Sequence, residues 1–182
     1  MNTEPALQTT SKSSSGQEDW RQNPNESLTS GRVEFISFSI GDEQYGVDIM
    51  AVREIKGWTE ITHLPKQPEY VRGVLNLRGV MVPIIDLRCR FGQGKTEATA
   101  LHIVIVVQIG PRHVGLLADR VLDIVGFNAS QIQPVPRVAQ ASNVDFLSGL
   151  VTIESQMIAL IDLASLLSSS DVDVPSEQLT PA

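Results

Sequence analysis

The chain has few of the groups that covalent, redox or metal chemistry requires. It holds 1 cysteine and 3 histidines among 182 residues. Cys89 has no partner for an internal disulfide, and a single cysteine of this kind is typical of a packed core. His63, His102 and His113 are scattered along the sequence and form no cluster with metal-ligand spacing. We therefore expect no disulfide, no bound metal and no cofactor.

Positive charge is also scarce. The chain has 14 Lys and Arg against 21 Asp and Glu, which gives a net charge of -7. Binding of DNA or RNA requires clustered basic side chains that replace counterions on phosphates, so nucleic acid partners are excluded. The longest apolar run, around Ile103–Val107, is far shorter than the roughly 20 residues that cross a bilayer. Because the amino terminus also has no apolar signal segment, we expect a cytoplasmic protein without direct membrane insertion.

Motifs for catalysis are missing as well. Gly92–Thr96 ends like a phosphate-binding loop, but Cys89 stands where the first glycine of that motif is required. The segment also follows a predicted helix and precedes a predicted strand, which is the reverse of a nucleotide-binding loop. No Gly-x-Ser-x-Gly elbow occurs. The carboxylates available for acid–base chemistry are typical of helix caps and solvated turns: Asp86, Asp119, Asp123, Asp145 and Asp162. We expect no catalytic residue and no enzyme activity.

Polar segments flank a central domain. Residues 1–31 are rich in Ser, Thr, Gln, Asn and Glu, and Trp20 is their only aromatic residue. Such a segment buries too little surface to offset its ordering entropy, so we predict a disordered arm. Residues 169–182 have the same character and predict a disordered tail. The folded domain is expected to span residues 32–168.

Within this domain the sequence predicts short strands. Glu34–Ile40 alternates apolar and polar residues, and a polar turn separates it from Tyr45–Asp48, which predicts a hairpin. Leu101–Ile109 is apolar on both faces, so we predict a central strand where two halves of the fold meet. Asp86 and Asp162 each precede a short apolar stretch and are predicted to cap short helices. Frequent turns and little helix favour an all-β fold of two five-stranded barrels.

Proline adds one further expectation. Pro83 has no amide hydrogen to donate to a neighbouring strand. We therefore predict that its strand lies at a sheet edge or begins at this residue.

The predicted strands come in two copies. Val71–Leu87 aligns without gaps with Leu147–Leu163, and Ile40–Ile55 aligns with Ile109–Ile124. The length difference falls in the proline-containing loop between them. This pattern predicts a duplicated module. Features that both copies keep, such as Gly73 with Gly149 and Gly46 with Gly115, are interpreted as requirements of the fold.

The two copies differ in charge at one turn. Arg78 of the first copy aligns with Glu154 of the second, and Arg72 aligns with Ser148. Since the second copy folds with Glu154 there, the barrel does not need a cation at that turn, and Arg78 becomes a candidate binding residue. The alternative is an ordinary solvated turn arginine.

Several motifs together resemble the CheW family of chemotaxis coupling proteins. The matching segments are Gly41–Glu43, Tyr45–Ile49, Asn76–Val80, Pro83–Ile84 and Asp86–Arg88. The resemblance runs from about Val33 to Leu167 and covers both copies. It implies two SH3-like five-stranded barrels in tandem, intertwined around a shared hydrophobic core. It also implies an adaptor without catalysis that couples the cytoplasmic tip of chemoreceptors to the regulatory domain of the histidine kinase CheA, in receptor arrays at the inner membrane.

The resemblance also implies which residues bind. A receptor helical hairpin is expected between the barrels, with an apolar stripe and a polar rim. The matching positions are Val52, Glu54, Ile55, Arg72, Arg78 and Ile103. A contact in a ring of adaptor and kinase domains maps to Gln133 and Val138, and Gln133 departs from the arginine of some relatives. For Val52 and Ile55 the alternative is packing onto their own barrel.

Two other functions compete with this interpretation. An adaptor of the same fold in another chemosensory pathway, such as surface motility or gene regulation, would have the same sequence features. A small-ligand module would need convergent polar groups in the groove between the barrels, and the sequence offers few of them.

Overall fold

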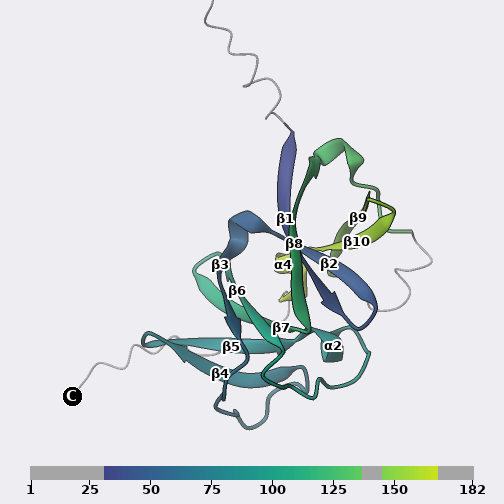
Figure 1. The fold of residues 1–182 in the computed structure, drawn as a ribbon. Coiled ribbons are helices and arrows are strands. Elements are labelled where there is room, and N and C mark those ends of the chain that lie inside the picture. Colours follow the sequence, from purple (N-terminus) through teal and green to yellow (C-terminus); the bar gives the residue numbers. More distant parts are fainter. Residues whose placement is uncertain (1–30, 137–144, 168–182) are drawn as a thin grey trace, which may run out of the picture. The chain divides into compact units, whose positions relative to one another are not determined.

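Two five-stranded sheets make up the described part of the chain (Figure 1). The computed structural model describes residues 31–136 and 145–167. The predicted tail of residues 169–182 and the predicted arm of residues 1–31, apart from Gly31, lie outside these ranges. The elements, in order, are β1 (Arg32–Ile40), β2 (Glu43–Asp48), η1 (Ile49–Ala51), β3 (Val52–Gly57), β4 (Val71–Leu77), β5 (Val80–Asp86), α2 (Leu87–Arg90), β6 (Ile103–Ile109), β7 (Arg112–Ala118), β8 (Arg120–Asn128), η2 (Ala129–Gln131), β9 (Leu147–Ile153), β10 (Gln156–Ile161) and α4 (Leu163–Leu166).

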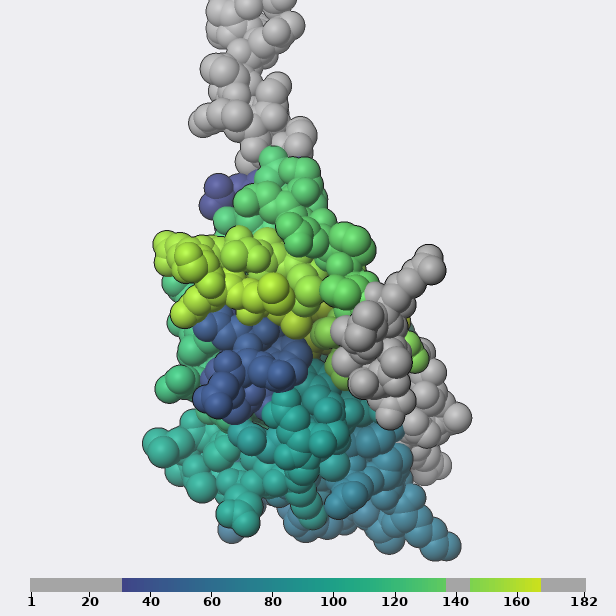
Figure 2. Space-filling view, turned by 90° about the vertical axis from the view of Figure 1, so that its right-hand side faces the viewer, coloured from purple at the N-terminus to yellow at the C-terminus, as the bar shows by residue number. Residues whose placement is uncertain are grey.

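Each sheet takes strands from both sequence copies. Sheet A has the strand order β8-β1-β2-β10-β9, and sheet B has the order β3-β6-β7-β5-β4. The first copy thus gives two strands to sheet A and three to sheet B, and the second copy does the reverse. Strands of different copies pair at four places: the antiparallel pairs β1–β8 and β3–β6, and the parallel pairs β2–β10 and β5–β7. The parallel pairs place Gly46 opposite Leu160 and Gly115 opposite Ile84. Figure 2 shows the β2–β10 junction, where the blue segment of β2 lies against the yellow-green strands of the second copy.

Because each sheet combines strands of both copies, the buried apolar residues form three cores. The interior of sheet B holds Leu75, Val82, Ile84, Val104, Val106 and Leu117. The interior of sheet A holds Phe35, Phe127, Val151, Ile158 and Leu160. A third and larger core lies between the sheets, with residues such as Phe38, Ile85 and Ile105 from strands of both. The predicted all-β fold of two SH3-like barrels with a shared core is confirmed.

Gly73 and Gly149, which both copies keep, allow close backbone approach. A β-carbon on Gly73 would collide with the carbonyl oxygen of Thr62, and φ at Gly73 is +144°. A β-carbon on Gly149 would lie 2.5 Å from Cγ2 of Ile132. In each barrel this close approach lets the segment that precedes the strand pair with it through an isolated antiparallel β-bridge. The bridges are Thr62–Val74 with β4 and Gln133–Leu150 with β9.

The structure confirms several sequence predictions and corrects one. Asp86 and Asp162 cap α2 and α4, and β6 lies between β3 and β7. The prediction for Pro83 is wrong, because β5 lies between β4 and β7 and begins at Val80. Pro83 fits there because pairing with β7 begins only at Ile84, so its missing donor costs no bond to that strand.

Candidate protein-binding site

Arg78 lies at the exposed tip of the β4–β5 hairpin. Its side chain is 88% exposed, and its Nη2 donates to Oε2 of Glu54 at 3.0 Å. Glu54 belongs to β3, at the opposite end of sheet B in the strand order. The ion pair therefore links the two ends of the curled sheet. It closes one side of a cavity of about 270 Å³ that Val80 and Val106 also line.

The hairpin tips of the two barrels share one turn geometry. Arg78 and Gly79 have φ values of 52° and 87°, and the equivalent residues Glu154 and Ser155 have 49° and 69°. Two residues with positive φ between antiparallel strands form the type I′ turn that matches strand twist. The charge reversal predicted from the repeat thus occurs on an unchanged backbone.

A β-bulge turns Val52 and Ile55 to the same face of sheet B. Val52 lies opposite Val107 and Ile55 opposite Ile105, and the register shifts at Arg53 between them. Directly opposite residues of antiparallel strands share a face, so the extra residue brings two side chains three positions apart onto one face. A regular strand would have placed them on opposite faces.

This face is the rim of the shared core. Val52 and Ile103 are half-buried and pack against that core. Ile55, on the same face, is 43% exposed. Three of the six predicted receptor residues therefore form one apolar surface, which we call the rim surface. Glu54 and Arg78 meet on the other face of β3, and because β3 is an edge strand, a partner lying along it reaches both.

Strand β8 repeats this arrangement in sheet A. Val121 lies opposite Phe38 and Ile124 opposite Ile36, with a register shift at Leu122. Val121 packs against the shared core, and Ile124 is 55% exposed. These residues were missed in the sequence analysis, although the alignment of Val52–Ile55 with Val121–Ile124 was a signal that could have found them.

Arg72 differs from Arg78, the other predicted receptor arginine, because its side chain is mostly buried. Its side chain is 11% exposed, and its Nη1 donates to Oδ2 of Asp86 at 3.1 Å and to the carbonyl oxygen of Thr96 at 2.6 Å. The guanidinium also lies 5.9 Å from the ring centroid of Trp58. These contacts are internal to the barrel, so Arg72 offers little surface to a partner.

The predicted kinase contact is described only in part. Gln133 is exposed, and its backbone pairs with Leu150 through two hydrogen bonds of 2.8 Å. Val138 lies outside the described residues. The bridge fixes Gln133 at the side of sheet A where β9 ends the strand order.

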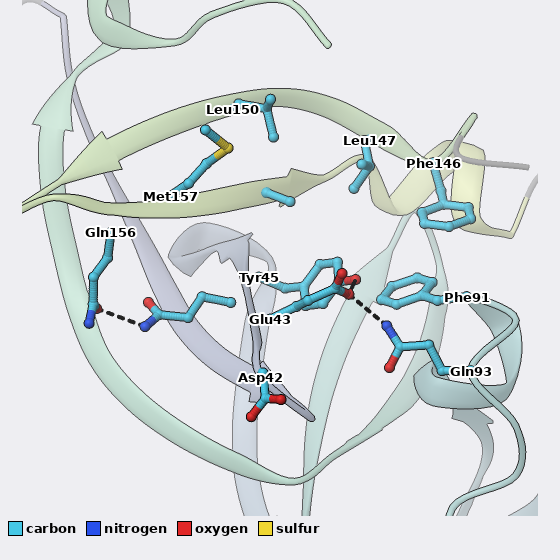
Figure 3. A pocket seen from close by; sticks show the side chains of 12 residues that line it. Asp42, Glu43, Tyr45, Phe91, Gln93, Phe146, Leu147, Leu150, Gln156 and Met157 are labelled. Carbon is cyan, nitrogen blue, oxygen red and sulfur yellow. Dashed lines mark hydrogen bonds between the residues drawn. The ribbon is translucent and has the colours of Figure 1, made fainter. Parts of the chain in front are cut away.

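A second, larger cavity opens beside β2, β9 and β10, which the sequence analysis did not predict. Its volume is about 730 Å³, and Figure 3 shows Tyr45, Phe91 and Phe146 along one side of it. Burial, followed by the hydrogen bond to Glu43, raises the pKa of the Tyr45 hydroxyl. That hydroxyl therefore stays protonated and donates to Oε2 of Glu43 at 2.7 Å.

Two features of the described residues concern metal binding and thiol chemistry. Among these residues, no group of three or more His, Cys, Asp or Glu side chains could hold a metal ion. Burial raises the pKa of the Cys89 thiol, which disfavours the reactive thiolate. No helix among these residues is long and apolar enough to cross a membrane.

Comparisons with known proteins agree on one family. The family described as "CheW-like domain" matches residues 34–171. The chain is 45% identical to a chemotaxis protein CheW of Rhizobium meliloti over 79% of this chain and 93% of that protein. It is 41% identical to a chemotaxis protein CheW of Klebsiella aerogenes, covering 76% and 84% of the two chains. The solved scaffolding protein TtCheW of Thermoanaerobacter tengcongensis is similar at 33% identity with a TM-score of 0.70, over 76% of this chain and 90% of that one.

Proposed function

Because this chain belongs to the CheW family, we propose that it is a non-enzymatic scaffold of bacterial chemotaxis that couples chemoreceptors to the histidine kinase CheA. Relatives at 41% and 45% identity carry the chemotaxis name, which favours this pathway over another chemosensory pathway. The family match over residues 34–171 supports a functional domain of residues 32–168. As a partner of receptors, the protein would be recruited to receptor arrays at the inner membrane.

The receptor surface that we propose consists of the rim surface and the adjoining ion pair. Its members are Val52, Ile55, Ile103, Glu54 and Arg78. Val121 and Ile124 of β8, the strand of the second copy that corresponds to β3, extend it. Partly exposed apolar side chains around a shared core are suited to bury the apolar stripe of a receptor helix. Charged groups at the edge then fix the register of that helix more than they add affinity.

The observation that carries the proposal is the position of Arg78. It is 88% exposed, it lies on a rigid two-residue turn, and the barrel does not need it, since Glu154 occupies the equivalent turn. Arg72 is left out of the surface because its guanidinium is already bonded to Asp86 and Thr96. We assign Arg72 a structural role instead.

The kinase contact is proposed at Gln133 and Val138. The support for it is the resemblance together with the exposure of Gln133 at the β9 side of sheet A. It lies on a different sheet from Arg78, which would let one molecule bind receptor and kinase at once.

A binding experiment tests the receptor surface. The full chain is mixed with a dimeric cytoplasmic fragment of a chemoreceptor encoded in the same genome, and the amount captured is measured for the parent and for Arg78→Glu. Reversal of charge at a register-fixing contact is expected to weaken capture about tenfold or more. The matched control is Lys95→Glu, which makes the same charge change at an exposed position in the loop after α2, away from the proposed surface. Equal capture by Arg78→Glu and parent would refute the proposed surface.

A further inference from the structure

Strands β3 and β8 carry equivalent bulges with different residues beside them. Ser37 of β1 lies opposite Asp123 of β8, and Val106 of β6 lies opposite Glu54 of β3. On their other sides, Ser37 and Val106 each lie opposite one of the two glycines that both copies keep in β2 and β7. The two residues therefore occupy the same position of the two barrels, with a hydroxyl in one and two methyl groups in the other.

The hydroxyl of Ser37 holds the bulge of β8. It donates to the carbonyl oxygen of Asp123 at 2.9 Å and accepts from the amide of Asp123 at 3.1 Å. Both bonds go to the residue that directly follows Leu122, the extra residue of the bulge. Ser37 is 2% exposed, and a buried hydroxyl is costly unless it is bonded. A valine would bury more apolar surface there, as Val106 does in the other barrel, so packing alone does not explain the serine.

A second set of contacts fixes the start of β8. Asp119 lies where the chain passes from β7 to β8, and its Oδ2 accepts from the amide of Gly41 at 2.7 Å and from Nη2 of Arg88 at 2.6 Å. Its own amide donates to the carbonyl oxygen of Ser39 at 3.1 Å. At the equivalent passage from β2 to β3 stands Met50, which is 78% exposed and whose amide donates to the side chain two residues earlier. Asp119 thus ties β8 to distant segments, whereas this contact of Met50 is local.

We infer that Ser37 and Asp119 are positioning residues of the receptor surface, which hold the bulge of β8 and thereby keep Val121 and Ile124 on one face. The two residues act on either side of the bulge, because Asp119 precedes Val121 by two residues and Ser37 bonds to the residue before Ile124. The β3 half of the surface has a valine and a methionine at the equivalent positions, and these side chains can form neither contact. This inference rests on the proposed receptor surface and adds the residues that orient one half of it.

An isosteric pair of substitutions tests the hydroxyl of Ser37. Threonine and valine have nearly the same shape, but only Ser37→Thr keeps a hydroxyl. NMR spectroscopy of the full chain measures hydrogen exchange at the Asp123 amide and the nuclear Overhauser effect between the methyl groups of Val121 and Ile124, which share a face because of the bulge. In Ser37→Val we expect exchange about fivefold to tenfold faster, as for one lost hydrogen bond, and a weaker Overhauser effect.

Ser37→Thr is expected to behave like the parent in both measurements. Ser37→Ala adds no volume, so it repeats the comparison if the larger residues prevent folding, and it should exchange as fast as Ser37→Val. Equal exchange and equal Overhauser effects with and without the hydroxyl would overturn the inference.

Receptor capture tests the consequence for binding. Ser37→Val/Asp119→Asn removes the hydroxyl and the charge that pairs with Arg88, and it should lower capture of the receptor fragment about tenfold, because the surface must then be ordered on binding. Asp162→Asn, which weakens the cap of α4 instead, is the control for a general loss of stability and should capture as the parent does. If the double variant does not fold, Ser37→Val alone is measured, with a smaller loss expected.

Arg78→Glu in the same assay separates the two proposals. If Arg78→Glu loses capture while the variants of Ser37 and Asp119 do not, the positioning role is overturned and the receptor surface stands without its β8 half. If Arg78→Glu also captures as the parent does, the proposed receptor surface fails, and the exchange at Asp123 still decides whether the hydroxyl of Ser37 holds the bulge.

Discussion

Arg72 and Asp86 form a buried ion pair that the second barrel lacks. Asp86 is fully buried, and it accepts bonds from Nη1 of Arg72 and from the backbone and hydroxyl of Thr96. In the second copy the arginine is replaced by Ser148, whose hydroxyl donates to the carbonyl oxygen of Leu160. The pair therefore ties the loop after α2 to β4 only in the first copy.

Replacement of Arg72 by methionine tests this structural role. Arg72→Met keeps much of the side-chain volume but leaves a buried carboxylate without its counter-ion. We expect the free energy of unfolding to fall by about 3 kcal/mol, at the low end for a broken buried pair because Thr96 still donates. Urea denaturation measures it, with Ser148→Ala as the control at about 1 kcal/mol or less. A stability close to that of the parent would contradict the structural role.

Gly73 is predicted to tolerate no side chain. A β-carbon there collides with the backbone of Thr62, and φ is +144°. Gly73→Ala should therefore lower the free energy of unfolding by about 2–3 kcal/mol. Gly57→Ala is the matched control, since nothing lies within 4 Å of the added carbon. Equal thermal midpoints for the two variants would show that the close approach is unimportant.

The type I′ turns predict opposite effects of glycine and serine. Ser155 has φ of 69°, where a side chain costs backbone energy, while Gly79 occupies the same turn position of the first barrel. Ser155→Gly is expected to stabilise the protein by about 0.5–1 kcal/mol, and Gly79→Ser to destabilise it by a similar amount. Differential scanning calorimetry of both variants checks this. Shifts of the same sign would be inconsistent with the turn assignment.

Asp162 predicts a pH dependence at the α4 cap. The hydrogen bond from the Ser165 hydroxyl lowers the pKa of Asp162, and bonds from the backbone of Ser165 and Ala164 act in the same direction. A lowered folded-state pKa stabilises the fold above the unfolded value of about 3.9, and this contribution disappears as pH falls through the folded value. Asp162→Asn should therefore be less stable than the parent at neutral pH, with the difference shrinking below about pH 4.

A second variant isolates the cause. Ser165→Ala removes the largest contribution, so the pKa of Asp162 should move up toward its ordinary value in an NMR titration. An unchanged pKa in that variant would assign the shift to the backbone donors alone.

Features that depend on local patterns or on the internal repeat could be predicted from the sequence. The Glu34–Ile40 hairpin, the caps at Asp86 and Asp162 and the central position of the strand ending at Ile109 depend on local patterns, and all of them occur. The duplication added long-range information, because it paired Gly73 with Gly149 before any contact was known.

What could not be predicted depends on long-range pairing. The burial of Arg72 depends on Thr96, which lies 24 residues further along the chain and bonds to both Arg72 and Asp86. The edge position predicted for Pro83 is wrong because the sequence does not show that β5 pairs with β7 only from Ile84 onward. The shared face of Val52 and Ile55 comes from a bulge, and a bulge breaks the alternation on which strand prediction depends.

The exchange of strands between the repeats has a consequence for how such a chain arose. A polypeptide with a single repeat would carry two strands of one sheet and three of the other, and its apolar edges would be open. Two identical copies would complete each other as a two-fold symmetric homodimer. Fusion of the two genes would then free each half to diverge, so that one turn could gain an arginine while its twin became acidic.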